Sequence, residues 1–110
     1  MATSEEAKRA ENEAVFRDVN ERIETAAVEL DPPLERVPFL CECDDVGCRQ
    51  IISLTREEYE DVRRDGAVCV VVPGHSSGRE IVEERGAYAV IRKTDGEATV
   101  ARALDPRSEP

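Results

Sequence analysis

Aromatic residues are scarce in this chain of 110 residues, and tryptophan is absent. The aromatic side chains are Phe16, Phe39, Tyr59 and Tyr88, so a core must be built mainly from valine, isoleucine, leucine and alanine. The length is that of one domain, and a core so poor in large side chains is small for it. We therefore expect another interaction to help stabilise the fold.

Long apolar runs and an excess of positive charge are also missing. No run approaches the roughly 18 residues of a membrane span, and residues 1–8 lack the apolar core of a secretory signal. The net charge of -10 would repel a phosphate backbone. The sequence therefore predicts a cytoplasmic protein that has neither a membrane nor a nucleic acid as its partner.

The chain does contain a cluster of cysteines. Cys41, Cys43 and Cys48 lie within the stretch FLCECDDVGC, and the single histidine, His75, follows in VVVPGHSSG. In a reducing compartment, clustered cysteines are more often metal ligands or catalytic thiols than disulfides. Metal binding is therefore favoured over a disulfide framework.

The spacing of these residues suits a tetrahedral zinc ion. In an extended segment Cys41 and Cys43 point to the same side while Glu42 faces away. The turn formers of residues 44–47 can then bring Cys48 back to the same point. A structural zinc takes four sulfur or nitrogen ligands. The predicted zinc site is therefore Cys41, Cys43, Cys48 and His75.

Cys69 is the alternative fourth ligand. It lies within residues 67–72, which are apolar at every position and rich in β-branched side chains. This pattern predicts a buried strand, in which a free cysteine behaves as a small apolar residue. The sequence favours His75 but leaves the choice between His75 and Cys69 open.

Residues 1–30 contain no glycine or proline, and they predict a helix that begins after Ser4 as N-cap and ends by Pro32. An apolar stripe follows the helical period along its second half. The stripe could pack on its own domain, on a second copy or in a groove of a protein partner. Its members are Phe16, Val19, Ile23, Ala26 and Leu30, and the candidate interaction residues among them are Phe16, Val19, Ile23 and Leu30.

The rest of the chain predicts short strands and helices. Thr55 and Glu58 form a capping box for a helix over residues 56–65. Strands are expected at 37–40, 49–54, 67–72, 80–84 and 87–92, and a further short helix at 97–104. The first two strands should form a hairpin whose tip carries the cysteines, and Pro73-Gly74 should end the third strand in a turn just before His75. The predicted fold is α+β: an N-terminal amphipathic helix followed by a small zinc-stabilised mixed sheet with one or two short helices. The predicted parts are a helical arm with a proline-containing link at 1–33, a zinc-binding domain at 34–104 and a flexible tail at 105–110.

Several segments together resemble a family of small uncharacterised bacterial proteins that are common in actinobacteria. These segments are FRDVNERI, FLCEC, LTREEYEDVR, VVVPGH and AYAVIRK, and the shared pattern is C-E-C…C, L-T-x-x-E-Y-x-x-V-R and P-G-H. The resemblance covers most of residues 14–107. It implies a zinc-site-like constellation at Cys41, Cys43, Cys48 and His75, does not involve Cys69, and implies no established activity.

Three functions are compatible with such a site. The first is a non-catalytic module in which zinc stabilises the domain and the N-terminal helix contacts a protein partner or a second copy. The second is a redox switch, in which oxidation of the thiolates expels zinc. The third is a zinc-dependent hydrolase, with Glu42, Asp44 or Asp45 as a base, but it would need an open coordination position. We expect the first, and no enzymatic activity.

Overall fold

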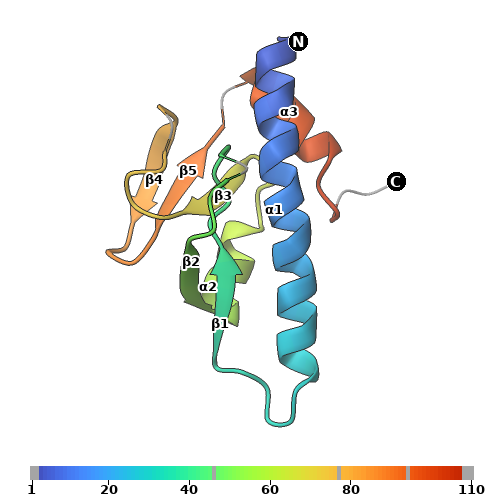
Figure 1. Cartoon of the computed structure of the whole chain (residues 1–110), viewed down its shortest axis with the longest axis vertical. Helices are drawn as coiled ribbons and strands as arrows, with labels where there is room; N and C mark the ends of the chain where they lie inside the picture. The colour runs from blue at the N-terminus through green and yellow to red at the C-terminus, as the bar shows by residue number, and fades with distance from the viewer. Residues whose placement is uncertain (1–2, 46, 77, 94, 108–110) are drawn as a thin grey trace.

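The computed structural model describes residues 3–45, 47–76, 78–93 and 95–107. Figure 1 shows the helices and strands formed by these residues, which confirm the α+β class. No helix in these ranges is both long enough and apolar enough to cross a membrane. In chain order the elements are α1 (Ser4–Glu29), β1 (Arg36–Leu40), β2 (Ile51–Thr55), α2 (Arg56–Val62), β3 (Val68–Val71), β4 (Glu80–Glu84), β5 (Ala89–Arg92) and α3 (Asp95–Ala103).

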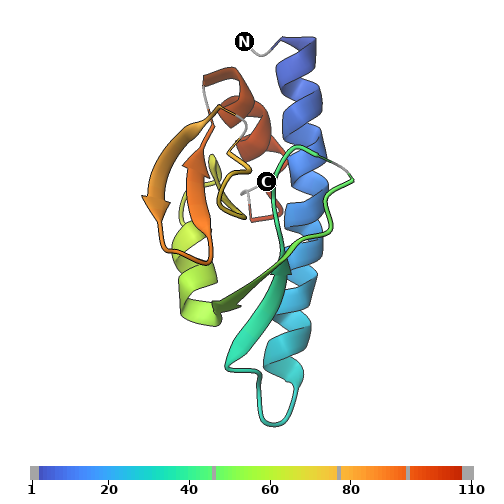
Figure 2. The same ribbon diagram turned by 60° about the vertical axis from the view of Figure 1, so that its left-hand side comes forward.

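The strands form two small antiparallel sheets. β1 and β2 make the predicted hairpin, in which Phe39 pairs with Ile52. The second sheet has the order β3-β5-β4, so the central strand is the last one in the chain. In both views α1 runs along one side of the molecule while the second sheet lies on the other side (Figures 1 and 2).

The core forms where the hairpin, α2 and β3 meet. The predicted capping box starts α2, because Thr55 accepts a hydrogen bond from the Glu58 amide at 3.1 Å and Glu58 accepts one from the Thr55 amide. This start places Tyr59 against Phe39, with stacked rings whose centroids lie 4.1 Å apart. Both rings are fully buried, so they contribute large apolar areas to a core with few aromatic side chains.

Helix α1 packs on the rest of the domain and is not a detached arm. Its N-cap is Thr3, which forms a capping box with Glu6, so the predicted N-cap Ser4 is wrong by one residue. The helix ends at Glu29, before the prolines, as predicted. Most of the side chains that it buries are polar; the buried residues are Ala10, Glu13, Phe16, Arg17, Asn20, Glu24 and Ala27.

The predicted apolar stripe is therefore not the packing face of α1. Phe16 is buried and Ile23 packs partly against the core, whereas Val19 and Leu30 are 37% and 50% exposed. The sequence left the packing of this stripe open, and apolar periodicity could not indicate the buried face, because that face consists mainly of charged and amide side chains. The exposed apolar residues of α1 include Val15, which the predicted stripe omitted.

The C-terminal segment contacts the rest of the domain as far as residue 107, within the tail predicted for 105–110. Asp105 forms an ion pair with Arg63, and Arg107 reaches carboxylates on α1 and α2, among them Glu24 at 3.1 Å. Gly66 permits this approach, because a Cβ there would lie 2.7 Å from Asp105 Oδ2. Residues 108–110 lie outside the described part of the chain.

Glu24 of α1 lies beside Glu60 of α2, and this contact predicts a pH dependence of stability. Burial, with the neighbouring Glu60 carboxyl, raises the pKa of Glu24 to about 7 in the folded protein. The contribution of Glu24 to stability is therefore greatest below its unfolded pKa and is lost as the pH rises through about 7. We expect the difference in the free energy of unfolding between Glu24→Gln and the parent to change in favour of the variant as the pH rises from 5 to 8.

Urea unfolding at each pH measures this difference, with Glu29→Gln at an exposed position of the same helix as the matched control. A constant difference between Glu24→Gln and the parent across this range would contradict the assignment.

Candidate metal site

Three cysteine side chains are brought together by the end of the β1–β2 hairpin. The Cys41 amide donates to the Gln50 carbonyl at 3.0 Å, which continues the pairing of β1 and β2 by one step. Beyond it the chain turns at Asp45, whose side chain accepts from the Gly47 amide and whose carbonyl accepts from the Cys48 amide, both at 2.9 Å. This turn returns Cys48 to the side of Cys41 and Cys43.

His75 comes from a separate tight turn after β3. The His75 amide donates to the Val72 carbonyl at 2.9 Å, and Gly74 between them has a φ of 94°. A proline followed by a residue with positive φ is typical of a type II turn, and here these residues are Pro73 and Gly74. The turn leaves the imidazole half-buried next to the cysteines.

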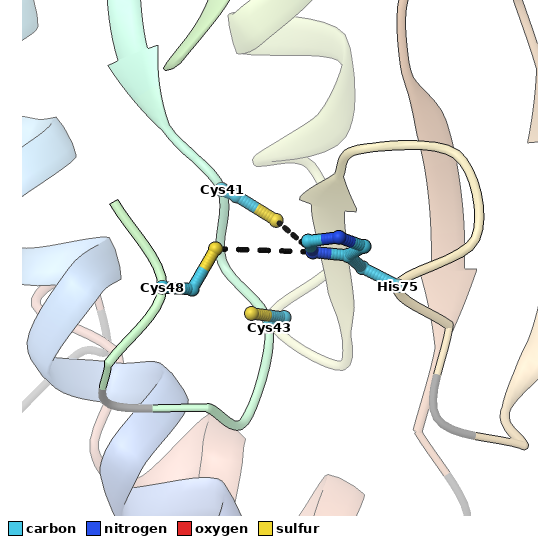
Figure 3. Close-up of side chains that lie close together, drawn as sticks. All are labelled: Cys41, Cys43, Cys48 and His75. Carbon is cyan, nitrogen blue, oxygen red and sulfur yellow. Dashed lines mark hydrogen bonds between the residues drawn. The ribbon is translucent and has the colours of Figure 1, made fainter. Parts of the chain in front are cut away.

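The four side chains converge on one point (Figure 3). His75 Nδ1 lies 3.5 Å from Cys41 Sγ and 3.8 Å from Cys48 Sγ, and all four donor atoms lie within 4.8 Å of one another. Donors held about 2.0 to 2.3 Å from a tetrahedral metal are separated by about 3.3 to 3.8 Å. The predicted ligand set Cys41, Cys43, Cys48 and His75 is thus assembled as a group that could hold a metal ion.

The cysteine side chains of this group are shielded from solvent. Cys41, Cys43 and Cys48 are free thiols with exposures of 1%, 2% and 9%. Burial raises the pKa of the Cys41 and Cys43 thiols, because a thiolate loses its hydration there. A divalent cation between the sulfurs would reverse this effect. The Val72 amide also donates to Cys41 Sγ at 3.2 Å, as expected around a metal-bound thiolate.

Cys69 does not belong to this group. In the part of the chain that the structure describes, the cluster of metal-ligating side chains comprises the other three cysteines and His75. Cys69 is fully buried in β3, and its sulfur accepts hydrogen bonds from Lys93 and Arg17. The alternative of Cys69 as the fourth ligand is therefore not supported, and its surroundings are more polar than an apolar strand predicted.

The structural role of Glu42 is the main feature of the site that the sequence did not reveal. Glu42 lies between the two cysteines in the sequence and is fully buried. Its carboxylate accepts from the Asn20 side chain at 2.8 Å and from the Val70 amide at 3.1 Å, and its own amide donates to the Val70 carbonyl at 2.8 Å. These contacts fix the chain between Cys41 and Cys43 to both α1 and β3.

The sequence held a partial signal for this role. Alternation along an extended segment places Glu42 opposite Cys41 and Cys43, so burial of the thiols on one side directs the carboxylate to the other. Asn20, which supplies its donor, lies next to an apolar position of a long helix and gave no signal alone. Two of the candidate bases for a hydrolase therefore make other contacts. The Glu42 carboxylate accepts the hydrogen bonds described above, and Asp44 forms an ion pair with Arg9 at 2.9 Å.

Comparison with known proteins adds no further information, because no family model, curated protein or solved structure matches the chain. The resemblance to actinobacterial proteins stays a prediction.

The contacts of Glu42 predict that it supports metal binding without touching the metal. Glu42→Gln replaces one of the two acceptor oxygens by an amide donor. The glutamine side chain therefore cannot accept the hydrogen bonds of both Asn20 and Val70. We expect a loss of zinc affinity of about tenfold or more and a loss of stability of about 1 to 3 kcal/mol. A competition titration against a chromophoric chelator, together with urea unfolding, measures both, and Glu35→Gln at an exposed position before β1 is the control. Unchanged affinity in Glu42→Gln would show that the cysteines are positioned without it.

Proposed function

We propose that this chain is a zinc-binding, non-catalytic module that acts through contact with another protein. The observation that carries the zinc assignment is the convergence of three thiols and one imidazole from two separate segments. A site with four protein ligands is typical of structural zinc, whereas catalytic zinc keeps one position for water or substrate. Sulfur ligands with one imidazole suit zinc better than magnesium or calcium, which prefer oxygen.

Zinc would also supply the stabilisation that the small core calls for. The cluster joins the tip of the β1–β2 hairpin to the turn after β3, so one ion would connect the two sheets. Structural zinc contributes on the order of 10 kcal/mol to the folding of small domains. We favour this structural role over the alternative of a redox switch, because a zinc bound by four protein ligands is the arrangement typical of structural sites.

The zinc assignment predicts about one equivalent of zinc in protein purified without added metal. Elemental analysis measures the content, and Co²⁺ substitution gives the absorption of a tetrahedral thiolate site. Cys43→Ser should lose the metal and unfold at lower temperature, whereas Cys69→Ser should keep both metal and spectrum. Protein without metal, or with iron and sulfide, would refute the assignment, and metal loss in Cys69→Ser with retention in His75→Asn would identify Cys69 as the fourth ligand.

The proposed contact surface is the exposed side of α1. Val15 and Val19 are one turn apart and are 59% and 37% exposed, and Leu30 at the end of the helix is 50% exposed. A helix that presents such residues can lie in an apolar groove of another protein. With a net charge of -10, a second copy of the chain would be repelled, so we favour a partner whose groove has a basic rim.

This surface predicts that Val15→Asp combined with Val19→Asp abolishes partner capture. Both side chains are exposed, so the zinc content should stay the same. The free energy of unfolding should change by less than about 1 kcal/mol. The matched control is Ile81→Asp with Val82→Asp, which changes exposed apolar residues on β4 instead. Affinity capture from a host lysate and light scattering measure the outcome. Capture that is equal in both double variants would remove α1 from the interface, and a change in solution mass would indicate self-association.

A further inference from the structure

Cys69 of β3 and Lys93, which directly follows β5, lie side by side, and neither belongs to the group of candidate metal ligands. The register of β3 and β5 pairs Cys69 with Ile91, and Lys93 follows two residues later on the same face. Residues in this diagonal relation are near enough for a long side chain to reach across. The Lys93 amide continues the pairing by donating to the Ala67 carbonyl at 2.9 Å, and Lys93 Nζ donates to Cys69 Sγ.

The pair is enclosed by charged groups. The Cys69 residue and the Lys93 side chain are both 0% exposed, and Arg17 also donates to Cys69 Sγ at 3.5 Å. Glu13 is 1% exposed, and its Oε1 lies 3.7 Å from Lys93 Nζ. Within the described ranges, neither carboxylate oxygen of Glu13 accepts a hydrogen bond, and burial raises the pKa of Glu13. Glu13 is thus placed to accept a proton from Lys93.

From this arrangement we propose that Cys69 and Lys93 form a reversible covalent cross-link when the protein is exposed to a peroxide. A free cysteine in an apolar core would have no partner for such a reaction. Here an amine is in hydrogen-bond contact with the sulfur, and a carboxylate is in ion-pair distance of the amine. Neither residue belongs to the proposed ligand group, so no zinc ligand takes part in the reaction.

The reaction has two balanced steps. In the first, Cys69 Sγ attacks hydrogen peroxide, the O–O bond breaks, and a sulfenic acid and one water molecule form. In the second, the ammonium of Lys93 transfers a proton to Glu13, and the free amine attacks the sulfenyl sulfur. The S–O bond breaks, an S–N bond forms, and the hydroxyl leaves as water with a second amine proton. Sulfur is oxidised by two electrons overall, and a thiol reductant reverses the link.

The oxidant must be small, because the pair is buried. Hydrogen peroxide resembles water in size and polarity, and local opening of the sheet edge would admit it. Formation of the link would replace a charged ammonium with a neutral nitrogen. Glu13 would then keep Arg79, whose NH2 lies 3.2 Å from its Oε2, but lose its attraction to Lys93. The modification would therefore change the charge balance under α1.

Peptide mass spectrometry tests the proposal directly. The full chain, as purified with its metal, is treated with hydrogen peroxide, and its free thiols are then alkylated before digestion with trypsin without reductant. A modified Lys93 resists cleavage, so the expected product joins residues 65–79 to residues 93–102. Its mass equals the sum of the two peptides less two hydrogen atoms. Treatment with dithiothreitol should separate the two peptides.

Controls within the chain make the result specific. Lys8 is the other lysine of the sequence and is exposed, so its failure to link shows that proximity decides the reaction. Lys93→Arg keeps the positive charge but is a poor nucleophile, and it should abolish the link. A linked product that retains one oxygen atom would still support the pair, with an S–O–N bridge formed by a second equivalent of peroxide.

Two results would overturn the proposal. One is Cys69 recovered only as alkylated thiol or as sulfinic acid, with Lys93 cleaved normally. The other is Cys69 joined to another cysteine or to Lys8. Both results are obtained with the parent protein, so they hold even if Lys93→Arg does not fold. The tryptic peptide of residues 37–49 carries Cys41, Cys43 and Cys48, so oxidation at the metal site is read separately in the same digest.

Discussion

The arrangement of the domain depends on the hydrogen bonds of the buried Glu42 carboxylate. This carboxylate accepts hydrogen bonds from Asn20 of α1 and from the backbone of β3, and it lies between two of the candidate metal ligands. Burial of a carboxylate is costly unless donors replace its hydration, and these two donors do so. Because successive side chains of an extended segment point to opposite sides, fixing Glu42 inward also directs Cys41 and Cys43 toward His75.

Helix α1 is held mainly by polar contacts, which is unusual for a helix that covers a small core. Arg17 donates to the carbonyl oxygens of Gly66 and Ala101 at 2.7 and 3.3 Å, and Asn20 exchanges two hydrogen bonds with the backbone of Leu40. Such contacts add little net stability compared with apolar packing, but they allow only one register of the helix. Loss of a single partner would leave a buried polar group unpaired, at a cost of about 1 to 3 kcal/mol.

The sequence was sufficient for the features that depend on local rules. The Thr55 and Glu58 capping box, the hairpin around the cysteines and the Pro73-Gly74 turn before His75 each follow from a few adjacent residues. The hairpin and the turn carry the candidate ligands. The packing face of α1 could not be found in this way, because apolar periodicity does not detect a face made of charged and amide groups. The polar surroundings of Cys69 depend on strand register, which places Lys93 beside it only once β3 and β5 are paired.

The candidate metal site and the docking of α1 are connected by a charged network. Asp44, from the loop that carries the cysteines, lies 2.9 Å from Arg9 of α1 and 3.5 Å from Arg79, which follows the histidine turn. Arg79 in turn contacts Glu13 of α1 at 3.2 Å and forms an ion pair with Glu97 of α3. Each ligand-bearing segment therefore contributes one charge to the same part of α1. Asp44 contributes a negative charge and Arg79 a positive one. An ion that holds these segments together would also set the spacing of Asp44 and Arg79, so metal binding and helix docking should stabilise each other through this network.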